Sequence, residues 1–512
     1  MTNAPALFRS LLVYGVCLPL AVVLGYLLAT PEHFSTIGVV VAIFVVLAIP
    51  LLLRWHHAWL IATWNTTAML FFVPGRPQVW MALAAVSFTI AILQYALNRK
   101  MRFLHAPSVT WPLIILTLVV FVTARLTGGI GVKLLGGDTY GGKRYFTILA
   151  AAIGFFAIIN RRIPPKRATL YVALFFLGAA TMAIGNLPGV VSPSLNFLFT
   201  IFPAMSMDSF TQQNSVVVQT IYISRLSGLS VLGMGGFCAV LACYGIRGVL
   251  DAAKPWRLAA LCTLFLLTLL GGFRSTVILL MMTFALLFFL EGLHRTSLLL
   301  PAIFVMVLGG GLVTVFASQL PLPFQRSLAF VPYIPIDPLV RMDAQGSTEW
   351  RLQMWQEVVP EIPHYLLVGK GYGFSGIEQY QIGMRGLEGF ELVGDYHNGP
   401  LSVILPFGLF GVIAFTWLVV AGIRVVYHNY RFGDPAFQTL NTFLFAYFVV
   451  KAIFFCAVFG SLHSDLAMFL GLLGLSISIN GGVAKPVAVP QPPAIVFNRF
   501  KLHPSVRRPA GA

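Results

Sequence analysis

The sequence predicts an all-α polytopic membrane protein with about 14 transmembrane helices (12 to 14) and one large periplasmic loop before the last three helices. Of the 512 residues, 58% are hydrophobic and only 10% are charged, whereas a soluble globular protein carries about 25% charged residues. The hydrophobic residues gather in fourteen runs, and a helix of about 20 apolar residues is enough to cross a bilayer. These observations exclude a water-soluble fold.

The apolar runs set the elements in chain order. Eleven helices are predicted in residues 1–318, near 8–29, 34–53, 58–74, 79–97, 109–127, 145–160, 168–186, 226–245, 257–271, 274–293 and 298–318. Three more are predicted in residues 397–480, near 399–422, 436–459 and 462–480. The run at 58–74 is interrupted by Asn65, Thr66 and Thr67, and its loss would change both the helix count and the pairing of helices.

Lysine and arginine are distributed unevenly between the two sides of the membrane that these predicted helices define. One side, with "NRKMR" at 98, "RRIPPKR" at 161 and the basic tail 481–512, takes 20 of the 33. Five of the other 13 lie in one long loop, which the positive-inside rule does not count, so both termini are predicted to be cytoplasmic. No A-x-A cleavage site follows the first run, which is therefore expected to stay uncleaved. The tail is expected to be disordered.

Charge and cysteine usage narrow the classes of partner. The formal charge of +17 is spread in short clusters between apolar runs, a pattern typical of membrane orientation rather than of nucleic-acid binding. All five cysteines fall inside apolar stretches, which argues against a disulfide framework or a zinc site.

The long loop, residues 319–396, is the soluble-like module of the prediction and holds nine of the sixteen acidic residues. Its start is rich in proline, its middle, "STEWRLQMWQEVV", predicts an amphipathic helix, and its end is rich in glycine. A loop of this length is usually functional or disordered, and Trp350 and Trp355 favour order. A second external segment, 187–225, is apolar but broken by prolines, which predicts a re-entrant or interfacial piece.

Three predicted helices descend from the outer face with a conspicuous polar residue at their start: Arg225 in "SRLSG", Arg274 in "GGFRST" and His397 in "DYHNGP". A helix start presents free N–H groups and the positive end of a dipole. Together with two guanidiniums, such starts suit an anion such as a phosphate. The same field disfavours an imidazolium, so His397 is expected to be neutral, the form that a general base needs.

Simpler explanations exist for these and neighbouring polar residues. Basic residues near helix ends commonly snorkel to headgroups, and an interfacial histidine can satisfy loop carbonyls. Arg351 stands one turn before Trp355 on the predicted loop helix and can cover its ring. Lys451, inside the thirteenth helix, can pair with a carbonyl or carboxylate. His463 and Asp465 in "SLHSDL" can cap the last helix.

Five short motifs follow one another between about residues 220 and 425: "RLSG" at 225, an arginine at a tight hairpin at 274, "RLQMW" at 351, "GKGYG" at 369 and "HNGPLSVILPFGLFG" at 397. In this order and spacing they resemble the O-antigen ligase and polymerase superfamily of bacterial envelope glycosyltransferases. Phe273 stands where that family often has a serine, and "YLLVGKGYG" stands where it has "PxxGxGxG".

The resemblance implies an inner-membrane enzyme that transfers or polymerises a glycan from an undecaprenyl-diphosphate donor onto an acceptor hydroxyl at the periplasmic face. It implies that Arg225, Arg274 and Arg351 hold the donor diphosphate, and that His397 is the catalytic histidine.

Three further residues are expected to support this site: Asn398, Trp355 and Asp395. No D-x-D motif or cluster of metal ligands is evident, and neither a metal nor a cofactor is expected. A lipid-linked oligosaccharide flippase or other transporter, and a protein O-oligosaccharyltransferase, remain alternatives. The sugar, the acceptor and the oligomeric state are left open.

Overall fold

The computed structural model describes residues 53–73, 75–98, 103–129, 141–203, 225–374 and 396–486, with five isolated positions before residue 53. Most of the predicted helices at 8–29 and 34–53 lies outside the described residues, as do Asp395 and the tail beyond residue 486. The described ranges form helices and turns, apart from one isolated antiparallel bridge between Met69 and Gln78.

The main helices, in chain order, are α3 (Val79–Leu97), α4 (Pro107–Thr127), α5 (Gly142–Ile158), α6 (Ala168–Leu177), α7 (Thr181–Ile184), α8 (Leu187–Val190), α10 (Ser227–Val249), α11 (Trp256–Leu270), α12 (Arg274–Leu290), α13 (Leu299–Phe316), α14 (Leu322–Leu328), α15 (Pro338–Val358), α16 (Ile362–Tyr365), α19 (Gly399–Phe432), α20 (Gln438–Ala457) and α21 (Leu462–Asn480). Short 3-10 turns join several of them, among them η4 (Pro193–Thr200).

Eight stretches within the described ranges are helical, long enough and apolar enough to cross a membrane, and α11 and α12 are shorter apolar helices. The chain is thus a multi-pass membrane protein. The full count of 12 to 14 spans includes segments outside the described residues and stays a prediction.

The predicted span at 58–74 is wrong. Helical structure covers residues 53–63 and ends at the turn formed by Trp64 and Asn65. The polar residues that interrupt the apolar run bond to other elements instead. Asn65 Nδ2 donates to the carbonyl of Phe175 at 2.8 Å, and the N–H of Thr67 donates to Thr181 Oγ1 at 3.0 Å. These tertiary hydrogen bonds satisfy the backbone outside a helix.

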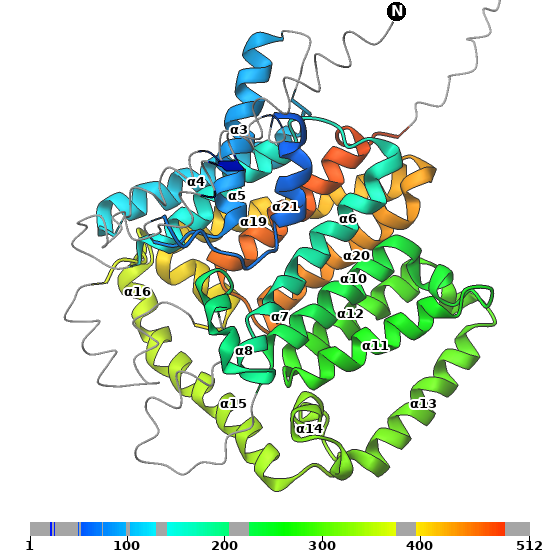
Figure 1. The fold of residues 1–512 in the computed structure, drawn as a ribbon. Helices are drawn as coiled ribbons and strands as arrows, with labels where there is room; N and C mark the ends of the chain where they lie inside the picture. The colour runs from blue at the N-terminus through cyan, green and yellow to red at the C-terminus, as the bar shows by residue number, and fades with distance from the viewer. Residues whose placement is uncertain are drawn as a thin grey trace, which may run out of the picture.

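The bundle packs around α10 and the last three helices (Figure 1). Helix α10 contacts α6, α11 and α20, while α19 contacts α4 and α20, and α21 contacts α5. Glycines allow the close approach on two sides of α10: a Cβ at Gly235 would lie 2.6 Å from the carbonyl oxygen of Phe176, and one at Gly233 would lie 2.5 Å from that of Leu264. Small residues at helix interfaces serve this purpose in membrane proteins.

Helix α19 is longer than predicted and is broken near its start. Pro406 lies inside it and Gly408 has φ 60° and ψ −161°. The segment "GKGYG" fills this break: the N–H groups of Lys370 and Gly371 donate to the carbonyls of Leu405 and Pro406 at 2.7 and 3.0 Å. A Cβ at Gly369 would lie 2.2 Å from the Pro406 oxygen, so this approach requires glycine.

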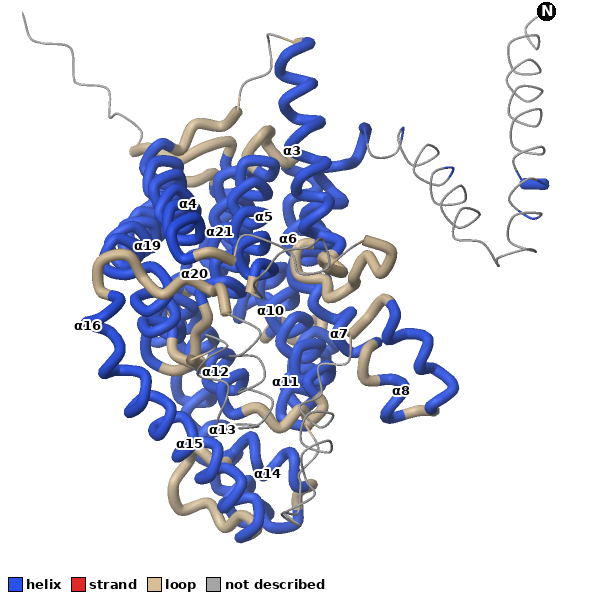
Figure 2. The backbone as a smooth tube through the Cα atoms, turned by 90° about the vertical axis from the view of Figure 1, so that its left-hand side faces the viewer, coloured by secondary structure: helices blue, strands red, loops and turns tan. Residues whose placement is uncertain are grey.

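Helices α14, α15 and α16 lie in the predicted loop 319–396. Helix α14 lies at one end of the molecule, below α11 and α12, and α15 rises from that end along the side towards α16 (Figure 2), which packs on α19. None of the residues of α13 is buried, and this helix runs along the edge of the molecule towards α14 (Figure 1). In the second predicted external segment, α8 and η4 are short helical pieces that pack on each other. Whether they enter a membrane stays a prediction.

Candidate functional site

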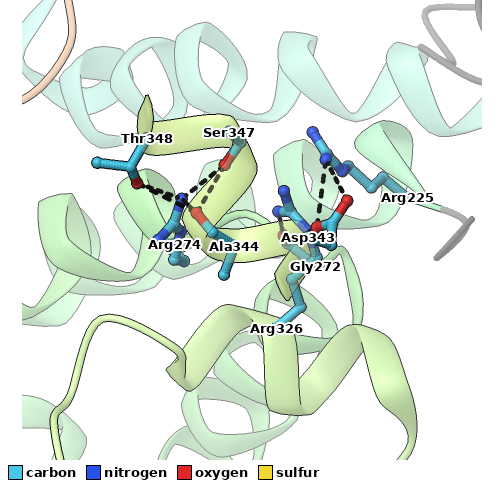
Figure 3. Close-up of polar contacts among 8 residues, drawn as sticks. All are labelled: Arg225, Gly272, Arg274, Arg326, Asp343, Ala344, Ser347 and Thr348. Carbon is cyan, nitrogen blue, oxygen red and sulfur yellow. Dashed lines mark hydrogen bonds and ion pairs between the residues drawn. The ribbon is translucent and has the colours of Figure 1, made fainter. Parts of the chain in front are cut away.

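Three arginines from three elements converge on the first half of α15 (Figure 3). Arg225, just before α10, places Nη2 3.3 and 3.4 Å from the two carboxylate oxygens of Asp343. Arg326 in α14 donates through Nε to the same carboxylate. Arg274, the first residue of α12, donates through Nη2 to the carbonyl of Ala344 at 3.0 Å and to Ser347 Oγ at 2.8 Å.

A tight turn between α11 and α12 sets the position of Arg274. Gly272 has φ 78°, a conformation that favours glycine. A Cβ at Gly271 would lie 2.4 Å from the Cβ of Ser230, so the turn packs directly against α10. The carbonyl of Gly272 accepts a hydrogen bond from Arg326 Nη1 at 2.6 Å, which ties the turn to α14.

Arg326 is the member of this group that the sequence analysis missed. In α14, three consecutive residues, Gln325, Arg326 and Ser327, are all buried. Gln325 Oε1 accepts from the N–H of Asp337 at 2.7 Å, and Ser327 Oγ donates to the carbonyl of Leu269 at 2.6 Å. Three adjacent polar residues show no helical periodicity, so the sequence did not indicate that they would be buried. The one local signal for Arg326 was its positive charge in a segment rich in proline.

The local charge is strongly positive. Burial, then repulsion from Arg225, lowers the pKa of Arg326 to about 10, although Asp343 acts in the opposite direction. Burial, followed by Arg225 and Arg326, also lowers the pKa of Arg351. Arg274 and Arg326 are both within electrostatic reach of Asp343 and of Arg225, and Arg351 is within reach of Arg225 and Arg326. Such a group favours an anion.

His397 lies beside the second half of α15. Its ring centroid is 5.5 Å from that of Trp350 and 5.2 Å from that of Phe459. The guanidinium carbon of Arg351 lies 5.8 Å from the same Phe459 ring. His397 has φ 49°, an uncommon conformation for a residue other than glycine and one that clusters at functional sites.

Helix α15 therefore links the predicted site residues. Its Asp343 contacts Arg225 and its Ala344 contacts Arg274, while Trp350 contacts His397. At 1.5 Å per helical residue, Asp343 and Trp350 are separated by roughly 10 Å along the axis.

Two of the predicted supporting residues fix the turn around His397. Asn398 Oδ1 accepts from the N–H of Leu401 at 3.1 Å and so caps α19. Trp355 Nε1 donates to the carbonyl of Tyr396 at 2.8 Å. The ring under the Arg351 guanidinium is Phe459 rather than the predicted Trp355. In the described ranges, no three His, Cys, Asp or Glu side chains come together as a metal site would require.

Of the simpler roles weighed for the last hairpin, the pairing of Lys451 with a carboxylate is observed. Lys451 pairs with Asp465 at 2.7 Å between Nζ and Oδ1. The other oxygen of Asp465 accepts from the N–H of Ser461, the N-cap of α21, at 2.8 Å. His463 Nδ1 lies 3.0 Å from Ser461 Oγ.

Comparison with protein families gives one match, which covers residues 258–416 and is described as O-antigen ligase. The match confirms the resemblance to the O-antigen ligase and polymerase superfamily. It runs from α11 into α19 and contains Arg274, Arg326, Arg351 and His397, whereas Arg225 precedes it. No curated protein matches the chain significantly.

Proposed function

We propose that this protein is an inner-membrane glycosyltransferase that moves a glycan from an undecaprenyl-diphosphate donor onto an acceptor hydroxyl at the periplasmic face, as an O-antigen ligase or a polysaccharide polymerase. The family match supports glycan transfer of this type. The observation that carries the finer proposal is the shared helix α15, which contacts Arg225 and Arg274 in its first half and His397 in its second.

In this proposal Arg225, Arg274 and Arg351 hold the donor diphosphate. The lipid diphosphate leaves the anomeric carbon with the bonding electron pair, so negative charge develops on its oxygens. Guanidiniums fixed in a partly buried place stabilise that charge without having to reorganise. Arg326 is too occupied to be a ligand, because Nε and Nη1 already bond Asp343 and Gly272. Instead, it holds α14, α15 and the turn before α12 together.

His397 acts as the general base. The acceptor oxygen attacks the anomeric carbon, and the imidazole takes the proton from the acceptor hydroxyl as the new glycosidic bond forms. General-base catalysis of this kind contributes about 10² to 10⁴ in rate. Asn398 and Trp355 place the ring through the cap of α19 and the carbonyl of Tyr396.

Glycan transfer by the purified, membrane-inserted protein tests the base. His397→Ala is expected to abolish transfer while the protein still inserts, whereas His428→Ala, near the opposite end of α19, should keep activity. Unchanged transfer by His397→Ala would defeat the proposal.

The test of the arginines keeps the positive charge and changes the geometry of the side chain. Arg274→Lys keeps a positive charge but cannot make the bidentate contact to phosphate, so most of the activity should be lost. Arg295→Lys, in the 3-10 turn after α12, is the matched control and should be near normal. Near-normal activity of Arg274→Lys would count against its role.

A transporter is the second candidate, because a buried ion pair of Lys451 and Asp465 lies inside the last hairpin, and ionisable residues within membrane helices often mark transport pathways. Reconstituted vesicles separate the two. Translocation of a labelled lipid-linked sugar without a new glycosidic bond would favour transport. A protein O-oligosaccharyltransferase would share the proposed chemistry, and a protein acceptor in the same assay would identify it.

A further inference from the structure

The turn between α20 and α21 packs directly against the turn that carries His397. The N–H of Leu462 donates to Ser402 Oγ at 3.0 Å, and Ser402 Oγ in turn donates to the carbonyl of Gly399 at 2.7 Å. A Cβ at Gly460 would lie 2.8 Å from the Cα of Gly399. The two turns are therefore in backbone contact, and the position of one determines that of the other.

Phe459 is the side chain that this contact brings to the site. Its ring lies 5.2 Å from the His397 ring, tilted by 32°, and 5.8 Å from the guanidinium carbon of Arg351. The N–H of Phe459 donates to the carbonyl of Phe454 at 3.0 Å, which fixes its backbone to the end of α20. One aromatic ring thus touches both the proposed base and a proposed phosphate ligand.

An ion pair between α20 and α21 bonds the turn that follows Phe459. Asp465 bonds the N–H of Ser461 through one oxygen and Lys451 through the other. Both charged side chains are 11% exposed. A buried ion pair contributes little net stability, because desolvation offsets the attraction. Its use here is geometric, since it fixes a turn two residues from Phe459 and joins α20 to α21.

We propose that Phe459 is a positioning residue for glycan transfer, which holds the imidazole of His397 and the guanidinium of Arg351 in a fixed relation, and that the Lys451–Asp465 pair anchors it. The inference rests on the proposed function, which supplies the roles of His397 and Arg351. Phe459 touches no reacting atom and acts through its two neighbours. An aromatic face attracts the guanidinium and stacks with the imidazole, and an aliphatic side chain supplies neither the cation–π nor the ring–ring contact.

The first test is the kinetics of Phe459→Leu. The variant keeps an apolar side chain but loses the ring, so kcat should fall roughly 10-fold to 100-fold, because a small misplacement of a catalytic group has effects of that size. The KM for the donor should rise by less than kcat falls, because Arg351 is one of three proposed diphosphate ligands. Phe459→Tyr restores the ring and should restore kcat. Phe445→Leu is the matched control, because this half-buried ring lies in the first half of α20 and stacks on Tyr430, and it should leave kcat unchanged.

The second test does not depend on activity. The rate at which diethyl pyrocarbonate modifies His397, followed by peptide mass spectrometry on the full-length protein, reports how closely the ring is packed. Phe459→Leu and Asp465→Asn should both raise this rate several-fold, while Phe459→Tyr and Phe445→Leu should not. Asp434→Asn, which alters a cap before α20, controls for the loss of a carboxylate.

The outcomes separate the two proposals. Wild-type values of kcat and of the His397 modification rate in Phe459→Leu would overturn the positioning role. A fall in kcat that merely follows a fall in folded protein, with His397 modified at the wild-type rate in the folded fraction, would overturn it as well. A wild-type protein that transfers no glycan, in which Phe459→Leu still exposes His397, would refute the proposed function while supporting the contact of Phe459 with His397.

Discussion

Asp343→Asn tests the electrostatic arrangement of the arginines most directly. The carboxylate bonds Arg225 through Nη2 and Arg326 through Nε, and the Arg326 side chain is only 4% exposed. An asparagine oxygen can replace one of these bonds but not the negative charge. The variant therefore leaves a buried guanidinium with neutral partners.

The expected loss of stability follows from these contacts. A hydrogen bond to a charged group contributes about 1.5 to 3 kcal/mol, and breaking a fully buried ion pair costs about 3 to 5 kcal/mol. Asp343 is 21% exposed and Arg225 14% exposed, so solvent screens part of the effect. We expect a loss of about 2 to 3 kcal/mol. At the same time, Arg225, Arg274 and Arg326 lose a neighbouring negative charge, so the affinity for a polyanion should rise.

Thermal unfolding in detergent, followed by tryptophan fluorescence with and without inorganic pyrophosphate, measures both effects. Asp343→Asn should unfold at a lower temperature than the wild type, and pyrophosphate should raise its unfolding temperature by more. Asp337→Asn is the control, because this residue caps the same helix and asparagine caps equally well. Equal unfolding temperatures for Asp343→Asn and the wild type would refute the assigned role of the carboxylate. An equal or smaller effect of pyrophosphate on the variant would refute the inference that the Asp343 carboxylate competes with a bound anion for the arginines.

Other substitutions test the contacts that hold the elements around the site together. Gly369→Ala should destabilise the protein by more than about 1 kcal/mol, since φ is +86° and the new Cβ would meet the Pro406 oxygen. Gly346→Ala lies at an open helical position in α15 and should stabilise the protein by about 0.5 to 1 kcal/mol. Thermal unfolding compares the two variants. Ser402→Ala removes a buried hydroxyl that joins two turns and should cost about 1 to 3 kcal/mol in the same assay; no change would show that the turns hold each other by packing alone. Arg326→Lys should lose stability as well as activity, because a lysine cannot reach both Asp343 and the carbonyl of Gly272; an active but less stable variant would confine Arg326 to the fold.

Most helices were predictable because the apolar runs end where polar residues or turn residues begin. The predicted 79–97 and 462–480 coincide with α3 and α21. The run at 58–74 failed because Asn65 and Thr67 bond partners more than a hundred positions away, and no local pattern encodes such partners. The break in α19 did have a local signal, Pro406 and Gly408, which the prediction of one continuous helix at 399–422 did not use.

The candidate site was predictable to a similar degree. Arg225, Arg274 and His397 stood out because each begins an apolar run, and helix starts can be read from the sequence. Arg326 lacked this signal, and its partners Gly272 and Asp343 lie on other elements. Phe459 looked like one more apolar residue at the end of a span. Its contacts depend on how two turns and helix α15 meet, which periodicity does not describe.

The "GKGYG" segment bound into the break of α19 has a mechanical consequence for α15. The carbonyl of Leu366 accepts from the N–H of Leu409 at 2.6 Å, and the N–H of Lys370 donates to the carbonyl of Leu405. Backbone hydrogen bonds therefore attach the chain after α15 to α19, the helix that follows His397. The position of α15 is therefore set at its C-terminal end by backbone hydrogen bonds to α19. At its Asp343 end it is set by the side chains of Arg225, Arg274 and Arg326.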